Sequence, residues 1–397
     1  MNLTPVAIAT EIVLAQNQDF GTEKVTFDKA QGRILAEQLA ADRDFPPFDR
    51  VTMDGIAINW QSYAEGQRIF SIAAMQAAGD AKKSLTNLQE CIEIMTGASL
   101  PENTDSVIRY EDLSIENGFA EINAIVKKGQ NIHKKGEDRL QNSIIVEASK
   151  VLRSTEIAIA ASIGASQITV KKLPKVLIIT SGDELVSVDS EPLAHQIRSS
   201  NIYCIATLLK DYQLNADFLH IADNLDETEN SISEALEKYD VLILSGGVSK
   251  GKKDFIPEAL AKNGVEKLFH RLQQQPGKPF WFGRKANKVV FALPGNPVSS
   301  FLCARRYFIP WLRKSLGIEP LNFDYAQLSE DFVIKSNLSY FLQVKIFQDK
   351  ATIMAKPIMG HGSGDLANLV ETDAFMELPA FERQEFKKGE VFRVWKF

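Results

Sequence analysis

The chain is organised around the stretch V-L-I-L-S-G-G-V-S-K-G-K-K-D, which runs from Val241 to Asp254. Its apolar start is typical of a strand buried on both faces, and a helical pattern follows from Phe255 to Lys262. Glycines in such a turn let backbone N–H groups approach a phosphate, and the helix dipole adds positive potential. An acid at its mouth, here Asp254, can hold Mg²⁺ against phosphate oxygens. A ligand-free connection between strand and helix would show the same local pattern, so both interpretations stay open here.

Strands and helices alternate on both sides of this stretch. Strands are predicted over Val176 to Thr180, Phe218 to Ala222 and Val289 to Leu293, and helices over Ile197 to Tyr212, Glu227 to Tyr239 and Val298 to Leu316. This alternation predicts an α/β domain over residues 173–317, with a doubly wound parallel sheet and helices on both faces.

Ligands bind such sheets outside the carboxyl ends of the strands, where the strand order switches. Loops that carry polar residues or glycine follow the expected strands at residues 181–184, 223, 245–254 and 294–297. We therefore expect these loops to converge on one site.

The first 172 residues predict one module inserted into another. Prolines among aromatic residues from Asp44 to Asp49 mark a boundary, and short strands and turns then predict a β-rich domain over residues 44–140. Helical spacing from Pro5 to Gln16 and from Ser154 to Gly164 predicts two helices that pack together, in a helical domain of residues 1–43 and 141–172. A short helix is also expected from Gly32 to Ala36.

Strand patterning returns in residues 318–397. The expected strands are Phe332 to Ile334, Tyr340 to Phe347, Thr352 to Ala355, Ala374 to Leu378 and Glu390 to Trp395. They predict a small C-terminal β-barrel, interrupted by a glycine-rich loop from Met359 to Asp365.

Composition excludes several classes of protein. The chain has 397 residues and a formal net charge of -6, so its surface as a whole does not attract nucleic acid. Cys91, Cys204 and Cys303 show neither metal-ligand spacing nor a disulfide framework, which suits a reducing cytoplasm. The N-terminus lacks a basic leader, and no apolar run is long enough to span a bilayer. We therefore expect a cytoplasmic protein without a membrane or nucleic-acid partner.

Several short motifs follow one another along nearly the whole chain. They are M-D-G at residues 53–55, M-T-G-A at 95–98, G-Q-N-I at 129–132, G-E-D at 136–138, T-S-G-D-E-L at 180–185, the opening S-G-G stretch, P-G-K-P at 276–279 and L-P-G-N-P-V-S at 293–299. In this order they resemble the molybdopterin molybdenumtransferase family, which includes MoeA and the E domain of gephyrin.

The resemblance implies an elongated homodimer of four-domain subunits, with the helical domain serving dimerisation. The active-site cleft would lie between the α/β domain of one subunit and the β modules of the other. The implied substrates are adenylylated molybdopterin and molybdate. Molybdate would be placed on the dithiolene sulfurs with release of AMP, giving molybdenum cofactor. Molybdopterin adenylyltransferase and molybdoenzyme apoproteins are the implied partners.

The residue types suit this reaction, because cleaving a phosphate anhydride needs charge neutralisation more than covalent chemistry. Asp254 and Asp223 are predicted to hold Mg²⁺. Backbone N–H groups around the S-G-G turn are predicted to cradle phosphates, and Lys278 in P-G-K-P adds a fixed positive charge. The predicted phosphate-binding residues of that turn are Ser245, Gly246, Gly247 and Ser249.

The remaining site residues divide between pterin, molybdate and the neighbouring subunit. Asp183 and Glu184 suit the N–H donors of a pterin, with Glu184 also counted as a catalytic acid. Residues predicted for molybdate and the P-G-N-P loop are Pro276, Pro294, Asn296, Pro297, Ser299 and Ser363. By family position, the inserted domain contributes Thr96 and the catalytic acids Asp54 and Asp138 across the dimer.

Each of these residues also has a plainer interpretation. Asp54 before Gly55 suits an ordinary turn, and Thr96 can simply end a strand. Asp138 can cap a turn or pair with Arg139. Ser363 can serve only a loop.

The sequence also departs from the family pattern. Arg50 and Val51 stand where the family commonly has an Asn-Ser pair, and His133 stands where many members have arginine. Arg271 and Gln275 stand where many members have lysine, so Gln275 removes a fixed positive charge. Lys345 is a candidate replacement for that charge.

Two other functions stay open. One is a related molybdopterin adenylyltransferase-like or nucleotide-cleaving enzyme, which would share the S-G-G-x-S domain but usually lacks the M-D-G and G-E-D module. The other is a non-catalytic, gephyrin-like scaffold that holds a peptide in the cleft. Such a scaffold needs partner-binding segments, and the sequence shows none.

Overall fold

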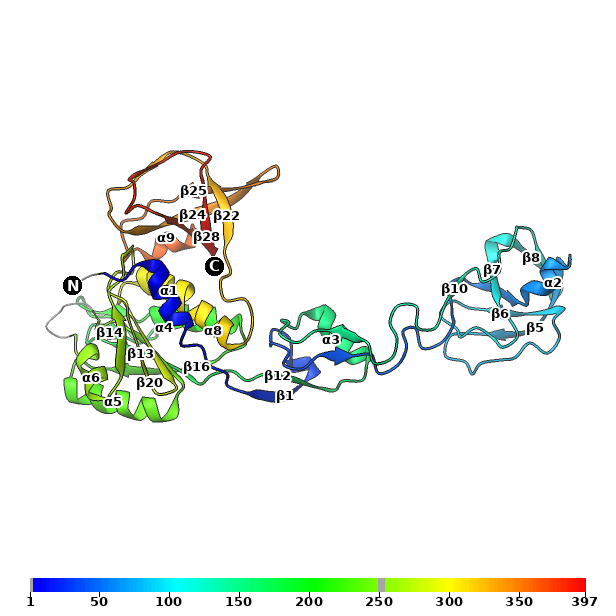
Figure 1. Cartoon of the computed structure of the whole chain (residues 1–397), viewed down its shortest axis with the longest axis horizontal. Helices are drawn as coiled ribbons and strands as arrows, with labels where there is room; N and C mark the ends of the chain where they lie inside the picture. Colours follow the sequence, from blue (N-terminus) through cyan, green and yellow to red (C-terminus); the bar gives the residue numbers. More distant parts are fainter. Residues whose placement is uncertain (1–2, 249–253) are drawn as a thin grey trace.

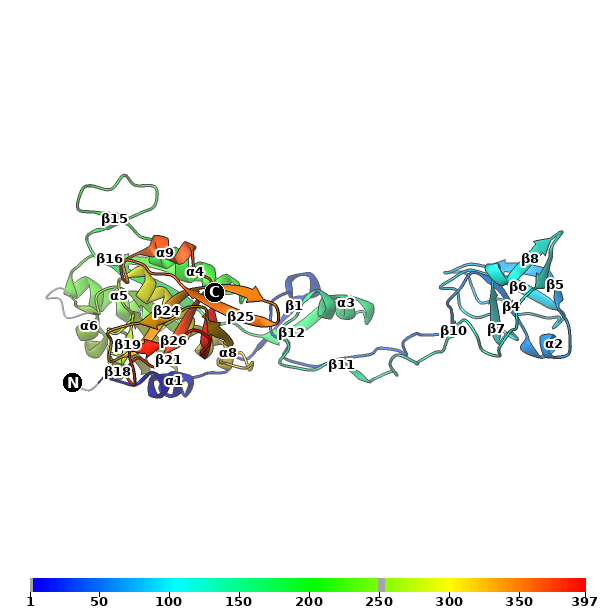
Figure 2. The same ribbon diagram turned by 90° about the horizontal axis from the view of Figure 1, so that it is seen from above.

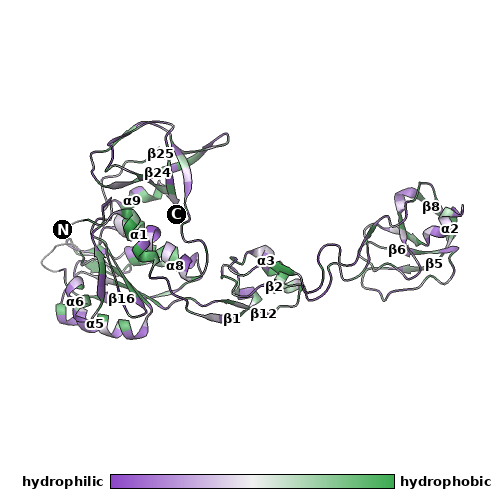
Figure 3. Ribbon diagram, viewed as in Figure 1, coloured by the Kyte–Doolittle hydropathy of each residue, from purple (hydrophilic) through white to green (hydrophobic). Residues whose placement is uncertain are grey.

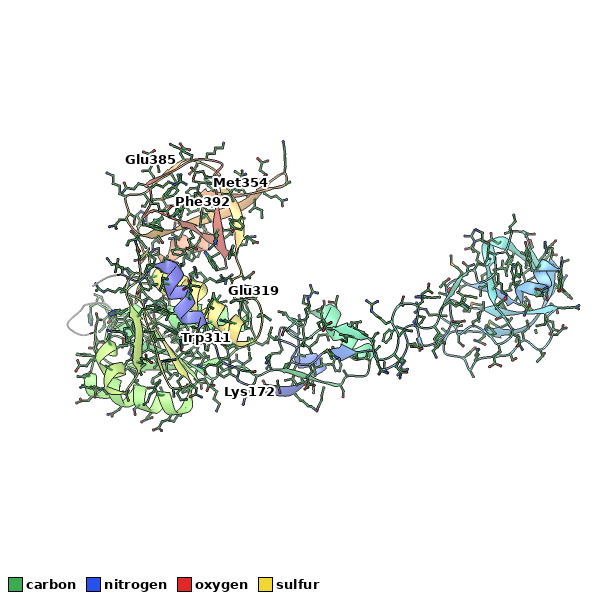
Figure 4. The ribbon with its side chains drawn as sticks, in the orientation of Figure 1. Lys172, Trp311, Glu319, Met354, Glu385 and Phe392 are labelled. Carbon is green, nitrogen blue, oxygen red and sulfur yellow. The ribbon has the colours of Figure 1, made fainter. Side chains whose placement is uncertain are left out.

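The computed structural model describes residues 3–248 and 254–397. These residues form an elongated arrangement of three bodies in a row (Figures 1 and 2). The large body holds the first helix and residues 176–396, the central body is built from residues 22–40 and 144–171, and the distal body from residues 50–133. Figure 4 labels Lys172 at the narrow link between the large and central bodies, where its N–H donates to the Gly21 carbonyl at 3.0 Å. The predicted combination of an α/β domain with β modules is confirmed.

A six-stranded sheet of order β16-β13-β17-β21-β20-β18 forms the core of the large body. Its strands are β13 (Val176–Ser181), β16 (Ala216–Ile221), β17 (Val241–Ser245), β18 (Glu266–His270), β20 (Trp281–Lys285) and β21 (Lys288–Leu293). The first four in spatial order are parallel, as predicted. The chain passes from β13 to β16 on one side and then crosses to β17 on the other, so the switch point lies between the carboxyl ends of β13 and β17.

The antiparallel strands β20 and β18 extend this sheet and were not predicted. A two-residue turn joins β20 to β21, because Lys285 pairs with Lys288. Such turns usually carry glycine or asparagine at the position of positive φ, but here Ala286 has a φ of 51°. The usual turn signal is therefore absent from the sequence.

Helices cover both faces of the sheet. They are α1 (Val6–Leu14), α4 (Asn201–Lys210), α5 (Leu225–Lys238), α6 (Ile256–Lys262), α7 (Pro297–Cys303) and α8 (Ile309–Ser315). Ile178 of β13 faces the core formed with α1, α4 and α8, whereas its neighbour Ile179 faces the core formed with α5 and α6. Figure 3 shows hydrophobic and hydrophilic residues side by side along α5 and α6, as expected for helices with one buried face.

The first helix does not pack where the sequence analysis expected it. Ala9 and Val13 of α1 share a buried core with Trp311 of α8, which Figure 4 labels beside α1. The helix α3 (Ser154–Ser162) lies in the central body instead, so the prediction that the two helices pack together is wrong. Helical spacing shows which face of a helix is apolar, but it does not show which element covers that face.

Two further predictions of helix fail locally. Gly32 has a φ of 79°, outside the right-handed helical region, and Ile34 and Leu35 instead form isolated β-bridges. The expected helix from Ile197 begins only at Asn201, because Ile197–Arg198 forms β15 and pairs with β14 (Leu185–Val186).

The last helix of the α/β sheet is continuous but not uniform. Between α7 and α8, residues Ala304–Phe308 form a π-helical segment, η3. Pro310 follows within the next turn and has no N–H to donate to the carbonyl of Arg306. The local change in helical pitch therefore has an identifiable cause.

Short antiparallel pairs form the central body. They are β1 (Thr22–Thr26) with β12 (Gln167–Lys171) and β2 (Leu39–Ala40) with β11 (Ile144–Val146). Leu35, Leu152 and Ala160 form part of its own buried core. Two backbone segments leave this body side by side and reach the distal body (Figures 1 and 2).

The distal body contains a six-stranded sheet of order β7-β4-β6-β5-β9-β8. Its elements are β3 (Arg50–Val51), β4 (Gly55–Ile58), α2 (Trp60–Ala64), β5 (Ile69–Gln76), β6 (Glu90–Ile94), β7 (Ser106–Arg109), β8 (Leu113–Glu116), β9 (Phe119–Ile122) and β10 (Ile132–His133). Strands β3 and β10 pair where the two connecting segments enter.

The C-terminal strands close into a barrel, because β24 pairs with both β25 and β26 while β22 and β28 complete the ring. Its elements are β22 (Asp324–Leu328), β24 (Ser339–Asp349), β25 (Thr352–Pro357), α9 (Leu366–Val370), β26 (Ala374–Leu378) and β28 (Val391–Lys396), with the side pair β23 (Phe332–Val333) and β27 (Glu385–Phe386). Strand β19 (Gln274–Gln275) comes from the α/β part of the chain and pairs with β24. This pairing carries the P-G-K-P segment to the edge of the barrel.

Candidate active site

A pocket of 720 Å³ lies at the carboxyl edge of the α/β sheet, against the barrel. Ser181, Gly246 and Pro294, which lie at the carboxyl ends of three neighbouring parallel strands, all line it. The predicted residues that line this pocket are Glu184, Asp223, Gly246, Gly247, Asp254, Pro276, Lys278, Pro294, Asn296, Ser299 and Ser363. Asp183, Ser245 and Pro297 are sequence neighbours of lining residues, and Ser249 lies outside the described residues.

The turn after β17 needs its glycines. Gly246 and Gly247 have φ values of 103° and 64°, which L side chains rarely adopt. A Cβ on Gly247 would lie 2.7 Å from Ile256 Cδ1 and 2.9 Å from Ser181 Oγ. No side chain therefore fits at Gly247 unless Ile256 or Ser181 is displaced.

Asn201 at the start of α4 connects two pocket loops. Its Nδ2 donates to Ser245 Oγ and to the Gly295 carbonyl, both at 2.8 Å. Ser245 is buried and is not among the residues that line the pocket, so it supports the turn. The sequence analysis missed Asn201 because an asparagine at a helix start has many ordinary explanations.

Two acids after β13 and β16 are held together. The backbone N–H of Asp223 donates to Asp183 Oδ1 at 3.1 Å, so Asp183 positions Asp223. The Glu184 carboxylate lies next to Gly182, since a Cβ added to Gly182 would lie 2.5 Å from Glu184 Oε2. Asp223 and Glu184 line the pocket, as does Asp254 from the other side of the S-G-G turn.

The P-G-N-P loop meets the glycine-rich loop of the barrel. Asn296 Nδ2 donates to Ser363 Oγ at 2.8 Å, and the Val298 N–H donates to the Ser363 carbonyl at 3.1 Å. Ser299 is 3% exposed at the first turn of α7. Ser363 therefore joins the barrel to the α/β sheet at the pocket.

A buried network of hydrogen bonds holds the P-G-K-P turn in place. Tyr307 Oη donates to Gln274 Oε1 at 2.5 Å, and Gln274 Nε2 donates to the Pro276 carbonyl at 3.0 Å. Gly277 has a φ of 94°, and a Cβ there would lie 2.7 Å from Cys303 Sγ. Burial raises the pKa of both Tyr307 and Cys303, so these groups stay neutral and act as structural supports. Sequence reasoning missed Gln274 and Tyr307, which are distant in sequence and carry no motif.

The described lining carries more negative than positive charge. Asp223, Asp254 and Glu184 are its acids, whereas Lys278 is its single cation among the described residues. Gln275, at the position singled out as a lost charge, accepts a hydrogen bond from Ser336 Oγ at 3.2 Å. In the described parts of the chain, no three His, Cys, Asp or Glu side chains gather closely enough to hold a metal by themselves.

The barrel contributes a wall that the sequence analysis did not predict. Tyr340 and Phe341 of β24 line the pocket, together with Met359 from the loop before α9. Burial raises the pKa of Tyr340, which therefore offers a neutral aromatic surface. Only the closure of the barrel against the sheet places these residues at the site.

The predicted residues of the inserted domain lie elsewhere in the same chain. Asp54, Thr96 and Asp138 belong to the distal body and its entry, far along the molecule from the pocket (Figure 1). Asp54 Oδ1 accepts the Thr96 N–H at 2.6 Å, and this hydrogen bond lowers the pKa of Asp54. His133 Nε2 lies 3.0 Å from Asp138 Oδ1. A single chain does not bring these residues to the pocket.

None of the helices in the described part of the chain is long and apolar enough to cross a membrane.

Comparison with known proteins assigns every body of the chain. Family models match residues 4–164 (MoeA N-terminal region, domains I and II), 177–314 (probable molybdopterin binding domain) and 325–397 (MoeA C-terminal region, domain IV). A molybdopterin molybdenumtransferase of Synechocystis is 40% identical over 393 residues, 98% of each chain. One of Staphylococcus aureus is 30% identical over 99% of this chain and 95% of its own.

Solved structures agree with this assignment. A crystal structure of the molybdopterin biosynthesis MoeA protein from Pyrococcus horikoshii has a TM-score of 0.85 and 28% sequence identity. The match covers 100% of this chain and 99% of that one, so it includes the central and distal bodies as well as the pocket. The chain therefore belongs to the MoeA family of molybdopterin molybdenumtransferases.

Proposed function

We propose that this chain inserts molybdate into adenylylated molybdopterin and releases AMP, giving molybdenum cofactor. The observation that carries the proposal is the convergence of four motif-bearing loops on one 720 Å³ pocket at the strand switch point. A pocket of this size accommodates a small organic ligand with a few well-placed polar groups. The relatives named molybdopterin molybdenumtransferase support the same reaction.

The S-G-G turn and Lys278 are the proposed phosphate-binding groups. The backbone N–H of Gly247 is the proposed donor to phosphate oxygens, because the Gly246 N–H already donates to the Leu293 carbonyl at 3.2 Å. Lys278 supplies a point charge on a turn that Gln274 and Tyr307 hold in place. Both features stabilise charge that leaves with the adenylate.

Asp223 and Asp254 are the proposed ligands of a divalent cation. Their oxygens are the donor type that Mg²⁺ prefers, and this ion usually takes one or two carboxylates together with substrate phosphates. Two protein acids therefore fit the ion without a third. When bound, the ion would neutralise phosphate oxygens. Asp183 orients Asp223 by accepting a hydrogen bond from its backbone N–H. Glu184 is then available to bind the pterin or to transfer a proton.

The opposite end of the pocket is the proposed molybdate site. Ser299 lies at the start of α7, where the N–H groups and the helix dipole favour an anion. The contact from Asn296 to Ser363 brings a second hydroxyl to the same end. The backbone of Pro276 borders this space.

A second copy of the chain is the proposed partner that completes the site. Asp54, Thr96 and Asp138 lie on a body that extends away from the pocket of their own chain. In a two-fold dimer of elongated subunits, the distal body of each can reach the pocket of the other. In this proposal, the cytoplasmic enzyme receives its substrate from an adenylyltransferase and delivers its product to apoenzymes.

The reaction is tested by incubating the protein with adenylylated molybdopterin and following AMP. We expect release that needs both molybdate and Mg²⁺ and that is abolished by a chelator. D254A should lower the rate about a hundredfold, the scale of losing one electrostatic stabiliser. D226A, at an exposed acid on α5, is the matched control and should leave the rate unchanged.

Two results would contradict the proposal. AMP release at the same rate without molybdate would instead indicate a nucleotide-cleaving enzyme. Tight binding of adenylylated molybdopterin without turnover would indicate a scaffold.

A further inference from the structure

Arg50, His133 and Asp138 form a chain of polar contacts at the entry to the distal body. Arg50 and His133 are direct partners in the antiparallel pair of β3 and β10, so their side chains share one face. Arg50 Nη2 lies 3.1 Å from His133 Nδ1, and His133 Nε2 lies 3.0 Å from Asp138 Oδ1. The imidazole ring thus bridges a guanidinium and a carboxylate.

The chemistry of these groups determines the tautomer of the ring. A guanidinium only donates hydrogen bonds, so His133 Nδ1 must accept from Arg50 and carries no proton. The ring proton then lies on Nε2 and is donated to Asp138. In this arrangement His133 is a neutral imidazole that transmits the orientation of Arg50 to Asp138.

We propose that Arg50 and neutral His133 act as one positioning unit that orients the carboxylate of Asp138 for the neighbouring subunit's pocket. This inference rests on the proposed function, which places Asp138 at that pocket. The exposure of the side chains fits the division of roles. The His133 side chain is 23% exposed, whereas that of Asp138 is 56% exposed. The ring is held within the protein surface while the carboxylate is presented to solvent.

A second proton on the His133 ring would break its contact with Arg50. His133 faces Arg50 from β3, and Asp138 and Glu137 from the turn after β10, with Glu137 Oε2 at 3.9 Å. A second ring proton would occupy Nδ1 and point at the guanidinium, replacing an attractive contact by repulsion between like charges. Arg50 would then release the ring.

The tautomer is tested first by ¹⁵N NMR of full-length protein labelled at histidine. H133Q removes one set of signals and so assigns it. At pH 8 we expect His133 to show an unprotonated Nδ1 and a protonated Nε2, and R50A to shift this pattern toward a mixture of tautomers. A protonated Nδ1, or a spectrum unaffected by R50A, would overturn the inference. This measurement requires no enzymatic activity.

The role is tested by the kcat of AMP release at pH 8. H133Q keeps one donor and one acceptor, so it should stay within about threefold of wild type at pH 8. H133F and R50A should lower kcat roughly tenfold or more, the scale of one hydrogen bond to a charged group. H195Q, on the exposed arm between β14 and β15, should leave kcat unchanged.

Two kinetic results would overturn the inference. One is a wild-type kcat in H133F, measured on protein whose melting temperature is unchanged. The other is higher activity in H133R than in H133Q, which would mean that the site needs a fixed cation rather than a neutral relay. If wild-type protein itself releases no AMP, the proposed function fails, while the NMR result still decides the arrangement of Arg50 and His133.

Discussion

Gly247 illustrates how the pocket depends on individual backbone positions. Its φ of 64° and the nearness of Ile256 Cδ1 exclude a side chain for two separate reasons. The first is a conformational cost of roughly 1 kcal/mol for an L residue, and the second is a collision with a buried neighbour. Both costs lower the stability of the turn, and the backbone shift that would relieve them would displace the proposed phosphate donor.

We expect G247A to destabilise the α/β body by about 2 kcal/mol and to weaken binding of adenylylated molybdopterin at least tenfold. G264A is a matched control, because Gly264 has a φ of 72° but its nearest neighbour, Lys285 Cε, would lie 4.0 Å from an added Cβ. G264A should show only the conformational cost of placing an L residue at a positive φ. Calorimetric melting and ligand titration check both variants. Equal behaviour of the two would show that the contact with Ile256 is unimportant.

At the scale of elements, the helix that runs from α7 through η3 to α8 supports the pocket from outside its lining. Cys303 and Tyr307 on this helix lie beneath the P-G-K-P turn, and Tyr307 reaches it through Gln274. The π-helical segment includes Tyr307, so the change of pitch affects the residue that makes this contact. Strand β19 attaches the same turn to the barrel. The position of Lys278 therefore depends on two other elements.

Y307F should leave Gln274 Oε1 without its buried donor, at a cost of about 1–3 kcal/mol. Because the turn loosens while the reacting groups remain, we expect KM to rise severalfold and kcat to change little. Y239F is the control, since Tyr239 Oη donates to Asp217 Oδ2 at 2.7 Å at an exposed site. Steady-state kinetics and melting curves check the pair. An unchanged KM and melting temperature in Y307F would contradict this account of the turn.

At the scale of the whole molecule, the proposed site residues are divided between two separated bodies. One set lines the pocket of the α/β sheet and barrel, and the other lies on the distal body beyond the central body (Figure 1). Each chain would then contribute to two active sites in a dimer, and each site would need both chains. Asp254 belongs to the set that lines the pocket, and Asp54 belongs to the set on the distal body.

Mixing D254A with D54A should restore activity if the site is shared between subunits. Random exchange makes half of the dimers mixed, and each mixed dimer has one intact site of two, so about a quarter of wild-type activity should return. Each variant alone should be nearly inactive. AMP release after mixing and subunit exchange measures this, with D254A mixed with D223A as the control that cannot complement. Absence of recovery, with mixed dimers demonstrated by mass, would place the whole site in one chain.

The strands of the α/β sheet were predictable because each is a short apolar run that ends in a polar or glycine-rich turn. Val241–Ser245 and Val176–Ser181 have this form, and the parallel order brings their carboxyl ends together. The hairpin of β20 and β21 was missed because Ala286 occupies the position where glycine or asparagine usually signals the turn. The bridges of Ile34 and Leu35 were missed because their partners are more than 100 residues away in sequence.

The amino-acid sequence alone was sufficient for the α/β sheet, the glycine turns and the family, since these depend on local patterns of apolar residues, glycine and short motifs. Tertiary structure was needed for the packing of α1 on α8, the support of Pro276 by Gln274 and Tyr307, and the barrel wall of the pocket. These features depend on which distant surfaces meet. A local pattern shows that a face is apolar or that a side chain can donate, but the partner is chosen by the packing of the whole chain.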